Sequence, residues 1–287
     1  MEDVSIDIPG GRMNVWHRPA EGGAPTAVLV HGLSGTSRWW TSVIEHLPTR
    51  LGLIALDVRG RGGSHDSPPP YDLATIADDI VLALDHFAID GAVVAGYSMG
   101  GWVAAIFAKR HPEMAKRVVL IDGGLEMPLP RDARADEVIQ SVVGPSLARL
   151  DVEFATREAF LEYWKAHPAL KRHWDPSMAT ALDYELHPRG GSFAVRINPK
   201  AIEESARQIT VDPTTRNAGL EVLVPAHLIV VERGTADQPG GMIPLQTAES
   251  AATRLTNLTM EYLPGVNHYT LILGAGASAV ASAIATP

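Results

Sequence analysis

Short, continuous apolar runs alternate with amphipathic segments over the first 125 residues of the chain. Apolar residues recur at spacings of three and four from Leu73 to Phe87, which predicts an amphipathic helix. A second helix is predicted at 100–110 and ends before Pro112, because proline disfavours helical geometry in the residue that precedes it. The runs between the helices are predicted strands, and they are 26–30, 51–56, 91–95 and 117–121. Apolar strands that alternate with helices predict an α/β fold with a mostly parallel sheet covered on both faces.

The pattern changes from about residue 126 to residue 222, where charges, prolines and aromatic residues are mixed and strand-like runs are missing. Within this region, the stretch from Phe154 to Trp164 has helical periodicity. We therefore predict a mainly helical insertion. The two predicted domains are a core of residues 1–124 and 225–287 and a helical cap, or lid, of residues 125–224.

The strand pattern returns after the insertion, with apolar runs at 226–231 and 258–263 and a predicted helix at 244–255 between them. The chain then ends in an apolar stretch from Leu271 to Ala285 that is rich in glycine, alanine and serine. This stretch is shorter than the ~20 residues that cross a bilayer. We expect a final helix packed on the core and no membrane-spanning segment.

Composition narrows the class of protein and the chemistry open to it. The chain has 287 residues, of which 46% are hydrophobic and 20% charged, and none is cysteine. Without cysteine it has no disulfide framework, thiolate metal site or cysteine nucleophile. The net charge of −9 and the lack of a long Lys/Arg run make nucleic acid and anionic membrane surfaces poor partners.

The first residues bear on localisation. They include Glu2 and Asp3, whereas a secretory signal starts with basic residues followed by an apolar region. We therefore expect a cytoplasmic protein that acts on a small-molecule substrate. The sequence leaves the oligomeric state open.

The strongest chemical signal is the segment Gly96-Tyr97-Ser98-Met99-Gly100, which lies between a predicted strand and a predicted helix. In that context the G-x-S-x-G pattern is a nucleophile elbow, a tight turn that exposes a serine hydroxyl. Side chains at Gly96 and Gly100 would collide with the neighbouring strand and helix, which explains both glycines. The helix that starts behind Ser98 favours developing negative charge. Ser98 is therefore the candidate nucleophile.

Two further segments follow predicted strands at the same edge of the sheet. His31-Gly32-Leu33-Ser34-Gly35 is placed to form an oxyanion hole, with the backbone N–H groups of Leu33 and Met99 as donors. His31 itself is expected to be structural. The glycine-rich segment 57–64 fits neither a dinucleotide-binding nor a phosphate-binding loop, so we expect a supporting turn there.

His268 lies on a predicted loop after the last strand and before the final helix. The chain order Ser, acid, His accompanies a nucleophile elbow and places the histidine there. His268 is therefore the candidate general base. The other ten histidines form no HExxH-like pair, so we expect no metal site.

Together these features make the chain resemble the α/β-hydrolase superfamily over nearly its whole length. The matching motifs are His31-Gly32, Asp57-Val58-Arg59-Gly60, Gly96-Tyr97-Ser98-Met99-Gly100-Gly101 and Gly265-Val266-Asn267-His268. The resemblance implies an eight-stranded, mostly parallel sheet, a helical cap inserted after the sixth strand, a Ser-His-acid triad and no cofactor. The serine at the elbow separates the chain from the superfamily's dehalogenases and epoxide hydrolases. It is similar to the capped esterases, lactonases and meta-cleavage-product hydrolases.

The acid of the triad has two candidates. In most members of the superfamily it follows the seventh strand, where this chain has Gly234 near the usual position and Asp237 shortly after it. A subset of members carries the acid at the tip of the sixth strand, where this chain has Asp122 before two glycines. We favour Asp122 and keep Asp237 as the alternative, because a carboxylate that orients the base needs such a strand-end position.

These residues predict a serine hydrolase that cleaves an ester or lactone bond of a small, mainly apolar or aromatic substrate through an acyl-enzyme. Four tryptophans are candidates for lining the pocket, namely Trp39, Trp40, Trp164 and Trp174. Two alternatives stay open. One is carbon–carbon bond hydrolysis or cofactor-free oxygen chemistry on the same fold, and the other is a hydrolase-like protein that binds a ligand without catalysis.

Overall fold

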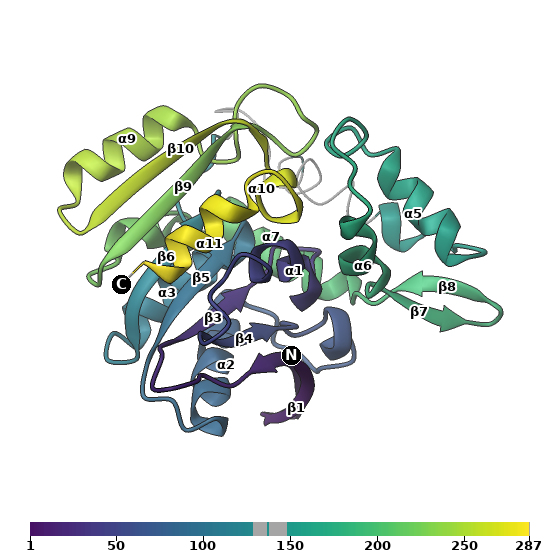
Figure 1. Cartoon of the computed structure of the whole chain (residues 1–287), viewed down its shortest axis with the longest axis horizontal. Coiled ribbons are helices and arrows are strands. Elements are labelled where there is room, and N and C mark those ends of the chain that lie inside the picture. Colours follow the sequence, from purple (N-terminus) through teal and green to yellow (C-terminus); the bar gives the residue numbers. More distant parts are fainter. Residues whose placement is uncertain (129–136, 138–147, 287) are drawn as a thin grey trace.

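An eight-stranded sheet forms the centre of the molecule (Figure 1). The computed structural model describes residues 1–128, 137 and 148–286. Along the sheet the strand order is β1-β2-β4-β3-β5-β6-β9-β10. The strands are β1 (Glu2–Ile8), β2 (Gly11–Arg18), β3 (Thr26–Val30), β4 (Gly52–Leu56), β5 (Ala92–Tyr97), β6 (Ala115–Ile121), β9 (Ala226–Arg233) and β10 (Leu258–Asn267).

Strands β4, β3, β5, β6, β9 and β10 pair in parallel, whereas β1 and β2 form an antiparallel hairpin at one edge of the sheet. Val30 of β3 lies beside Gly96 of β5, which in turn lies beside Leu120 of β6. The carboxyl ends of these strands therefore meet at one edge, where parallel sheets carry their binding sites. This arrangement confirms the predicted mostly parallel, eight-stranded α/β fold.

Helices cover both faces of the sheet, as strands that are apolar throughout require. On one face, α2 packs against α3, α3 packs against β5 and β6, and α9 packs against β9 and β10. On the other face, α11 packs against β6, α1 and α10. These helices are α1 (Thr41–Ile44), α2 (Leu73–His86), α3 (Met99–Arg110), α9 (Leu245–Arg254), α10 (Thr270–Leu273) and α11 (Ala277–Ala285).

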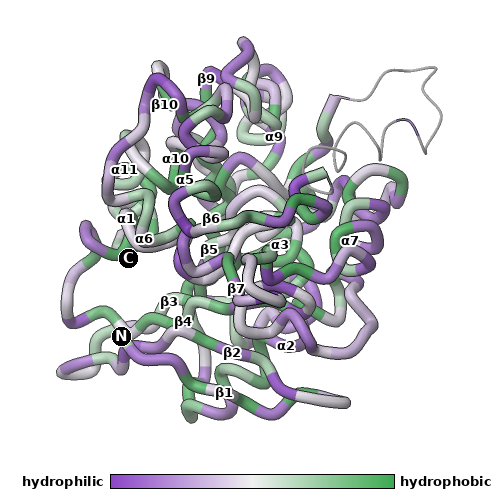
Figure 2. Tube along the Cα trace, turned by 90° about the vertical axis from the view of Figure 1, so that its right-hand side faces the viewer, coloured by the Kyte–Doolittle hydropathy of each residue, from purple (hydrophilic) through white to green (hydrophobic). Residues whose placement is uncertain are grey.

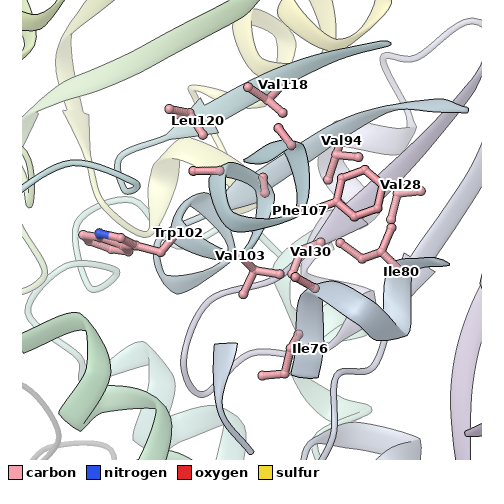
Figure 3. Close-up of a cluster of buried hydrophobic side chains, with 14 of the residues drawn as sticks. Val28, Val30, Ile76, Ile80, Val94, Trp102, Val103, Phe107, Val118 and Leu120 are labelled. Atoms are coloured by element: carbon pink, nitrogen blue, oxygen red, sulfur yellow. The ribbon is translucent and has the colours of Figure 1, made fainter. Parts of the chain in front are cut away.

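Alternate residues of the strands contribute to two hydrophobic clusters, one on each face of the sheet. In β3, Val28 and Val30 belong to the cluster with α2 and α3, whereas Ala27 and Leu29 belong to the cluster with α1, α10 and α11. Figure 3 shows part of the first cluster, built from the sheet strands, α2 and α3. Figure 2 shows hydrophobic residues along the central strands and hydrophilic residues mainly on the outer helices and turns.

Between β6 and β9 the chain forms further elements, of which α5, α6, β7 and β8 lie together at one side of the sheet (Figure 1). The elements are α5 (Arg157–Lys165), α6 (Ser177–Asp183), β7 (Leu186–Arg189), β8 (Ser192–Val195), α7 (Pro199–Val211) and α8 (Pro213–Arg216). The prediction of a mainly helical insertion did not include β7 and β8, which pair as an antiparallel hairpin. Gly190 and Gly191 join the two strands at φ angles of 57° and 94°, which glycine adopts easily.

The division of the chain into a core and a cap of residues 125–224 stays a prediction. Residues 129–136 and 138–147 of the predicted cap lie outside the described residues.

The C-terminal stretch departs from the predicted single helix, since it forms α10 and α11 with residues 274–276 between them. Gly276 packs so closely on the preceding turn that a Cβ there would lie 2.7 Å from the Leu271 Cα atom. The chain therefore bends at this point, and the two short helices pack against each other. No helix among the described residues is both long and apolar enough to span a membrane.

Candidate active site

Ser98 lies in the turn between β5 and α3, at the carboxyl edge of the sheet. Its backbone has a φ of 55° and a ψ of −122°, a strained conformation for a residue other than glycine. Close packing explains the two glycines of the motif. A Cβ on Gly96 would lie 1.8 Å from the Gly100 carbonyl oxygen, and a Cβ on Gly100 would lie 2.1 Å from the Val30 carbonyl oxygen. The local sequence thus forms the tight strand-turn-helix geometry of a nucleophile elbow.

Asp122, directly after β6, forms a hydrogen bond with His268. The distance between Asp122 Oδ2 and His268 Nδ1 is 2.7 Å, and the two side chains are 0% and 5% exposed. The carboxylate also accepts hydrogen bonds from the backbone N–H groups of Met242 and Ile243, both at 3.2 Å. Because the carboxylate accepts a hydrogen bond from Nδ1–H, it favours the tautomer in which His268 Nε2 is unprotonated and can accept a proton.

The imidazole of His268 lies next to the elbow. Its ring packs against the ring of Tyr97, the residue before Ser98, with 4.8 Å between the ring centres. The Tyr97 hydroxyl donates to the His268 carbonyl oxygen at 2.9 Å, which fixes the backbone as well. The Ser98 hydroxyl is directed toward the Met242 sulfur at 3.8 Å, and among the described residues it makes no hydrogen bond with His268. Hydrogen bonds of this kind often tighten only when a substrate binds.

The loop after β3 lies directly beside Ser98. A Cβ on Gly32 would be only 3.1 Å from the Ser98 Cβ atom. The backbone N–H groups of Leu33 and Met99 donate to no group among the described residues. Both N–H groups are therefore free to donate to a ligand oxygen, as an oxyanion hole requires.

His31 is a structural residue, as expected. Its Nδ1 donates to the Gly32 carbonyl oxygen at 2.7 Å, and its Nε2 accepts from the Val58 backbone N–H at 3.2 Å. Burial lowers the pKa of His31 to about 4, so the ring is neutral near pH 7. Asp57, at the start of the glycine-rich segment, accepts hydrogen bonds from the backbone N–H groups of Ser37 and Gly63. The segment 57–64 is thus a supporting turn.

Asp237, the alternative acid, is engaged elsewhere. Its carboxylate accepts hydrogen bonds from Arg233 Nε at 2.9 Å and from Asn267 Nδ2 at 3.1 Å. A second cation, Arg172, lies 3.5 Å from its other oxygen. In the described part of the chain, the carboxylate that reaches His268 is that of Asp122 and not that of Asp237.

Three aromatic side chains gather beside His268. Trp39, Trp164 and Tyr269 contact one another with ring centres 5.7 to 6.0 Å apart. Tyr269 also packs edge-on against His268, at 5.9 Å. Burial raises the pKa of Tyr269 to about 12, so its phenol is neutral near pH 7.

The other two predicted pocket tryptophans lie differently. Trp40 is fully buried in the hydrophobic cluster with α1, α10 and α11, and it presents no surface to a ligand. Trp174 is partly exposed, and the ammonium of Lys165 lies 5.6 Å from its ring centre. Among the described residues, Trp174 makes no ring contact with the aromatic group beside His268.

A buried ion pair connects the chain between β6 and β9 with the loop after β3. Arg149 Nη1 lies 2.8 Å from Glu185 Oε2, and both side chains are nearly inaccessible to solvent. The other Glu185 oxygen accepts the Trp39 indole N–H at 2.7 Å, and Arg149 Nη2 donates to the Ser34 carbonyl oxygen at 3.1 Å. Burial raises the pKa of Glu185 to about 7, outweighing the opposing effects of Arg149 and Trp39.

Several neighbours of the site carry no recognisable sequence signal. Arg149 and Glu185 are single charged residues in a region rich in charges, and Met242 reaches Ser98 from the loop after β9. Tyr269 is the exception, because its place next to His268 could have identified it. Among the described residues, no group of three or more His, Asp or Glu side chains is placed to hold a metal ion.

The chain matches a known protein family and resembles known proteins in sequence. A model of the alpha/beta hydrolase fold family matches residues 25–182. The chain is 32% identical over 124 residues to a Caulobacter vibrioides protein named as a carbamate hydrolase, RutD. That match covers 43% of this chain and 46% of the relative. The chain thus spans less than half the length of the first curated relatives that it matches.

Solved structures share the fold over almost the whole chain. E-2-(acetamidomethylene)succinate hydrolase has a TM-score of 0.79 at 20% identity, over 98% of this chain and 97% of that chain. N-formylmaleamic acid deformylase of Pseudomonas putida S16 has a TM-score of 0.70 at 19% identity, over 98% of this chain and 100% of that chain. At such identities the likeness concerns the fold alone.

Proposed function

Because the chain belongs to the alpha/beta hydrolase fold family, we propose that it is a serine hydrolase that cleaves an ester or lactone bond. The observation that carries this proposal is the 2.7 Å hydrogen bond between Asp122 and His268, next to the strained turn that holds Ser98. The proposed roles are nucleophile for Ser98, general base for His268 and base-orienting acid for Asp122.

In the proposed reaction, the Ser98 hydroxyl rotates toward His268, whose Nε2 takes its proton as Oγ bonds to the substrate carbonyl carbon. The carbonyl oxygen gains the electron pair and accepts hydrogen bonds from the N–H groups of Leu33 and Met99. Each such donor is typically worth ~3–4 kcal/mol in the transition state. His268 then protonates the leaving oxygen as the carbon–oxygen bond breaks. A water molecule, deprotonated by His268, attacks the acyl-enzyme and releases the acid and Ser98.

The surroundings of the site support a small, mainly apolar or aromatic substrate. Tyr269 is partly exposed beside the proposed base, and Trp39 and Trp164, each 2% exposed, pack behind it. Aromatic rings of this kind usually make up most of the contact area of a small-molecule pocket. We propose Tyr269 as a substrate contact, with Trp39 and Trp164 holding its ring in place.

A second candidate function is hydrolysis of a carbon–nitrogen bond in an amide or a carbamate. It is favoured by the name of a similar protein, a carbamate hydrolase. Ser98, His268 and Asp122 would have the same roles, since this reaction differs mainly in the leaving group that His268 must protonate. Carbon–carbon bond hydrolysis, cofactor-free oxygen chemistry and ligand binding without catalysis remain as alternatives on this fold.

The proposal is tested with esters, lactones, carbamates, amides and vinylogous diketones, offered to the wild type, Ser98→Ala and Ser282→Ala. Ser282 is an exposed serine on α11 and provides the matched control. We expect turnover of at least one ester or lactone, a loss of about 10³-fold or more in Ser98→Ala, and no change in Ser282→Ala. A fluorophosphonate should label Ser98, as detected by mass. Turnover that survives in Ser98→Ala would show that Ser98 is not the nucleophile.

A further inference from the structure

The loop after β3 is held by three side chains that bind three successive carbonyl groups. The pairs are His31 Nδ1 with Gly32, Arg61 Nε with Leu33 and Arg149 Nη2 with Ser34, at 2.7, 3.0 and 3.1 Å. In a trans peptide the C=O and N–H bonds point in opposite directions. Holding the Gly32 carbonyl group therefore fixes the direction of the Leu33 N–H group, and holding the Leu33 carbonyl group fixes the peptide plane on the other side of Leu33.

Arg61 makes the most extensive contacts of the three. It follows β4 and is fully buried. Its guanidinium also reaches the carbonyl oxygens of Arg59 and Ala201, the Ser205 hydroxyl and the Met99 sulfur, at 2.8, 3.0, 3.0 and 3.8 Å. Leu33 and Met99, whose N–H groups are the proposed oxyanion donors, thus contact the same cation. Since Ala201 and Ser205 belong to α7, the cation also ties this loop to the chain between β6 and β9.

The positive charge of Arg61 lacks a counter-ion at contact distance. All of its acceptors are neutral, and it forms no ion pair within residues 1–128 and 148–286. The neighbouring Arg59, by contrast, binds Asp79 at 2.6 Å, and Arg149 binds Glu185. Burial lowers the pKa of Arg61 to about 9, so the guanidinium stays charged near pH 7. An unpaired buried charge is costly to fold, which raises the question of what it does.

We propose that Arg61 is a positioning residue of the oxyanion hole, which holds Leu33 by its carbonyl group and Met99 by its sulfur and places a positive charge close to the two proposed donors. The inference rests on the proposed function, because an oxyanion forms only when Ser98 attacks a carbonyl. A fixed charge in a site that excludes water stabilises developing negative charge without reorganisation. The ground-state carbonyl is neutral and gains little, so kcat should depend on Arg61 far more than KM does.

The test compares Arg61→Met and Arg61→Lys with the control Arg59→Lys. Arg59 is the matched control because it is a buried arginine of the same turn whose charge is paired with Asp79. Rates are measured on an ester that the wild type turns over and are normalised to the fraction of molecules that a fluorophosphonate titrates. We expect Arg61→Met to lower kcat about 30- to 100-fold with KM within about threefold. Arg59→Lys should stay within about twofold.

Binding of a boronic acid gives a second readout that needs no turnover. Ser98 Oγ bonds to boron while its proton passes to His268, which leaves a tetrahedral boronate anion facing the oxyanion hole. We expect Arg61→Met to weaken boronate binding by the same factor as kcat. Arg61→Lys should weaken it less, because lysine keeps the charge but lacks the planar set of donors. A purely structural role would lower the Tm without changing normalised kcat or boronate affinity.

Unchanged normalised kcat and boronate affinity in Arg61→Met would overturn the inference. If Arg61→Met gives no folded protein, the normalised kcat and the boronate affinity of Arg61→Lys test the inference instead. A loss of about threefold or more in both quantities supports the inference, and wild-type values overturn it. Failure of the proposed function gives a different result, namely turnover that persists in Ser98→Ala. In that case no oxyanion forms at Ser98, and the inference is overturned together with the proposed function.

Discussion

At the scale of single residues, Asp122 is a carboxylate positioned by backbone groups and not by a cation. It has a φ of 43°, a conformation that is uncommon outside glycine and costs stability. In return, its oxygens meet the backbone N–H groups of Met242 and Ile243 and the imidazole of His268. The strained backbone conformation of Asp122 thus orients its carboxylate toward the proposed base.

Replacing each candidate acid with its amide should separate Asp122 from Asp237. We expect Asp122→Asn to lower kcat about 10³- to 10⁴-fold, because an amide cannot stabilise the imidazolium and favours the wrong tautomer. Asp237→Asn should stay within about threefold, since Asp237 binds Arg233 and Asn267. Steady-state kinetics on one ester measure both. The opposite ranking would assign the acid to Asp237.

The sequence could indicate Ser98 and His268 because each sits in a local pattern that has a geometric reason. Glycines flank Ser98, and His268 follows the last strand directly. The acid could not be chosen with the same firmness. Both Asp122 and Asp237 follow strands, and which of them reaches His268 depends on the path of the loops between β9 and the chain end. That path is a property of tertiary packing.

At the scale of elements, the ends of β5 and β6 approach so closely that side chains are excluded between them. A Cβ on Gly123 would lie 2.0 Å from the Ser98 carbonyl oxygen. The glycine after Asp122 is therefore what allows the acid and the nucleophile to sit on adjacent strand ends.

Gly123→Ala should force these two strand ends apart. We expect a loss of about 2–4 kcal/mol in the free energy of unfolding. We also expect a loss of tenfold or more in kcat, because Asp122 moves with the backbone. Denaturant unfolding and kinetics measure the two effects.

Gly190→Ala in the turn between β7 and β8 is the control for this substitution. Gly190 also has a positive φ, of 57°, but no atom within 4 Å of an added Cβ. We expect it to cost only about 1–2 kcal/mol and to leave kcat unchanged. If both variants behaved alike, close packing at Gly123 would not be the cause.

Burial distinguishes the elements that the sequence predicted from those that it did not predict. Strands such as β3 and β4 are buried at every residue and therefore appear as continuous apolar runs. The hairpin β7–β8 has exposed residues and only four residues in each strand, so it leaves no such run. The break between α10 and α11 depends on the contact of Gly276 with Leu271, which periodicity does not report.

At the scale of the whole molecule, the chain between β6 and β9 holds the segment after β3 directly at two places and, through Arg61, at a third. Arg149 binds the Ser34 carbonyl group, Glu185 binds the Trp39 indole, and Arg61 binds Ala201 of α7. The geometry of the proposed oxyanion hole therefore depends on both parts of the molecule.

This coupling predicts an unusual dependence of stability on pH. Glu185 has a pKa of about 7 in the folded protein, against 4.5 for an ordinary glutamate. Between these values the folded protein holds a proton that the unfolded chain has lost, so stability falls as pH rises. The contribution amounts to at most about 3 kcal/mol.

The measurement is the free energy of unfolding of the wild type relative to Glu185→Gln, from pH 4.5 to pH 8. Taking this difference cancels His31, which has a lowered pKa and therefore contributes with the opposite sign. We expect the wild type to lose stability relative to the variant up to about pH 7 and to level off above it. A relative stability that rises with pH would mean that Arg149 holds Glu185 ionised throughout this range.

The hydrogen bonds to Asp122 from the loop after β9 also bear on how this protein can change. Met242 and Ile243 recognise the carboxylate through N–H groups, which every residue except proline possesses. With Asp122, directly after β6, as the proposed acid, the loop after β9 is not required to supply a triad residue. Thr235 and Ala236, at the start of this loop, can therefore be replaced by other amino acids without changing the groups proposed to react. The loop is thus a natural starting point for evolving a new substrate range.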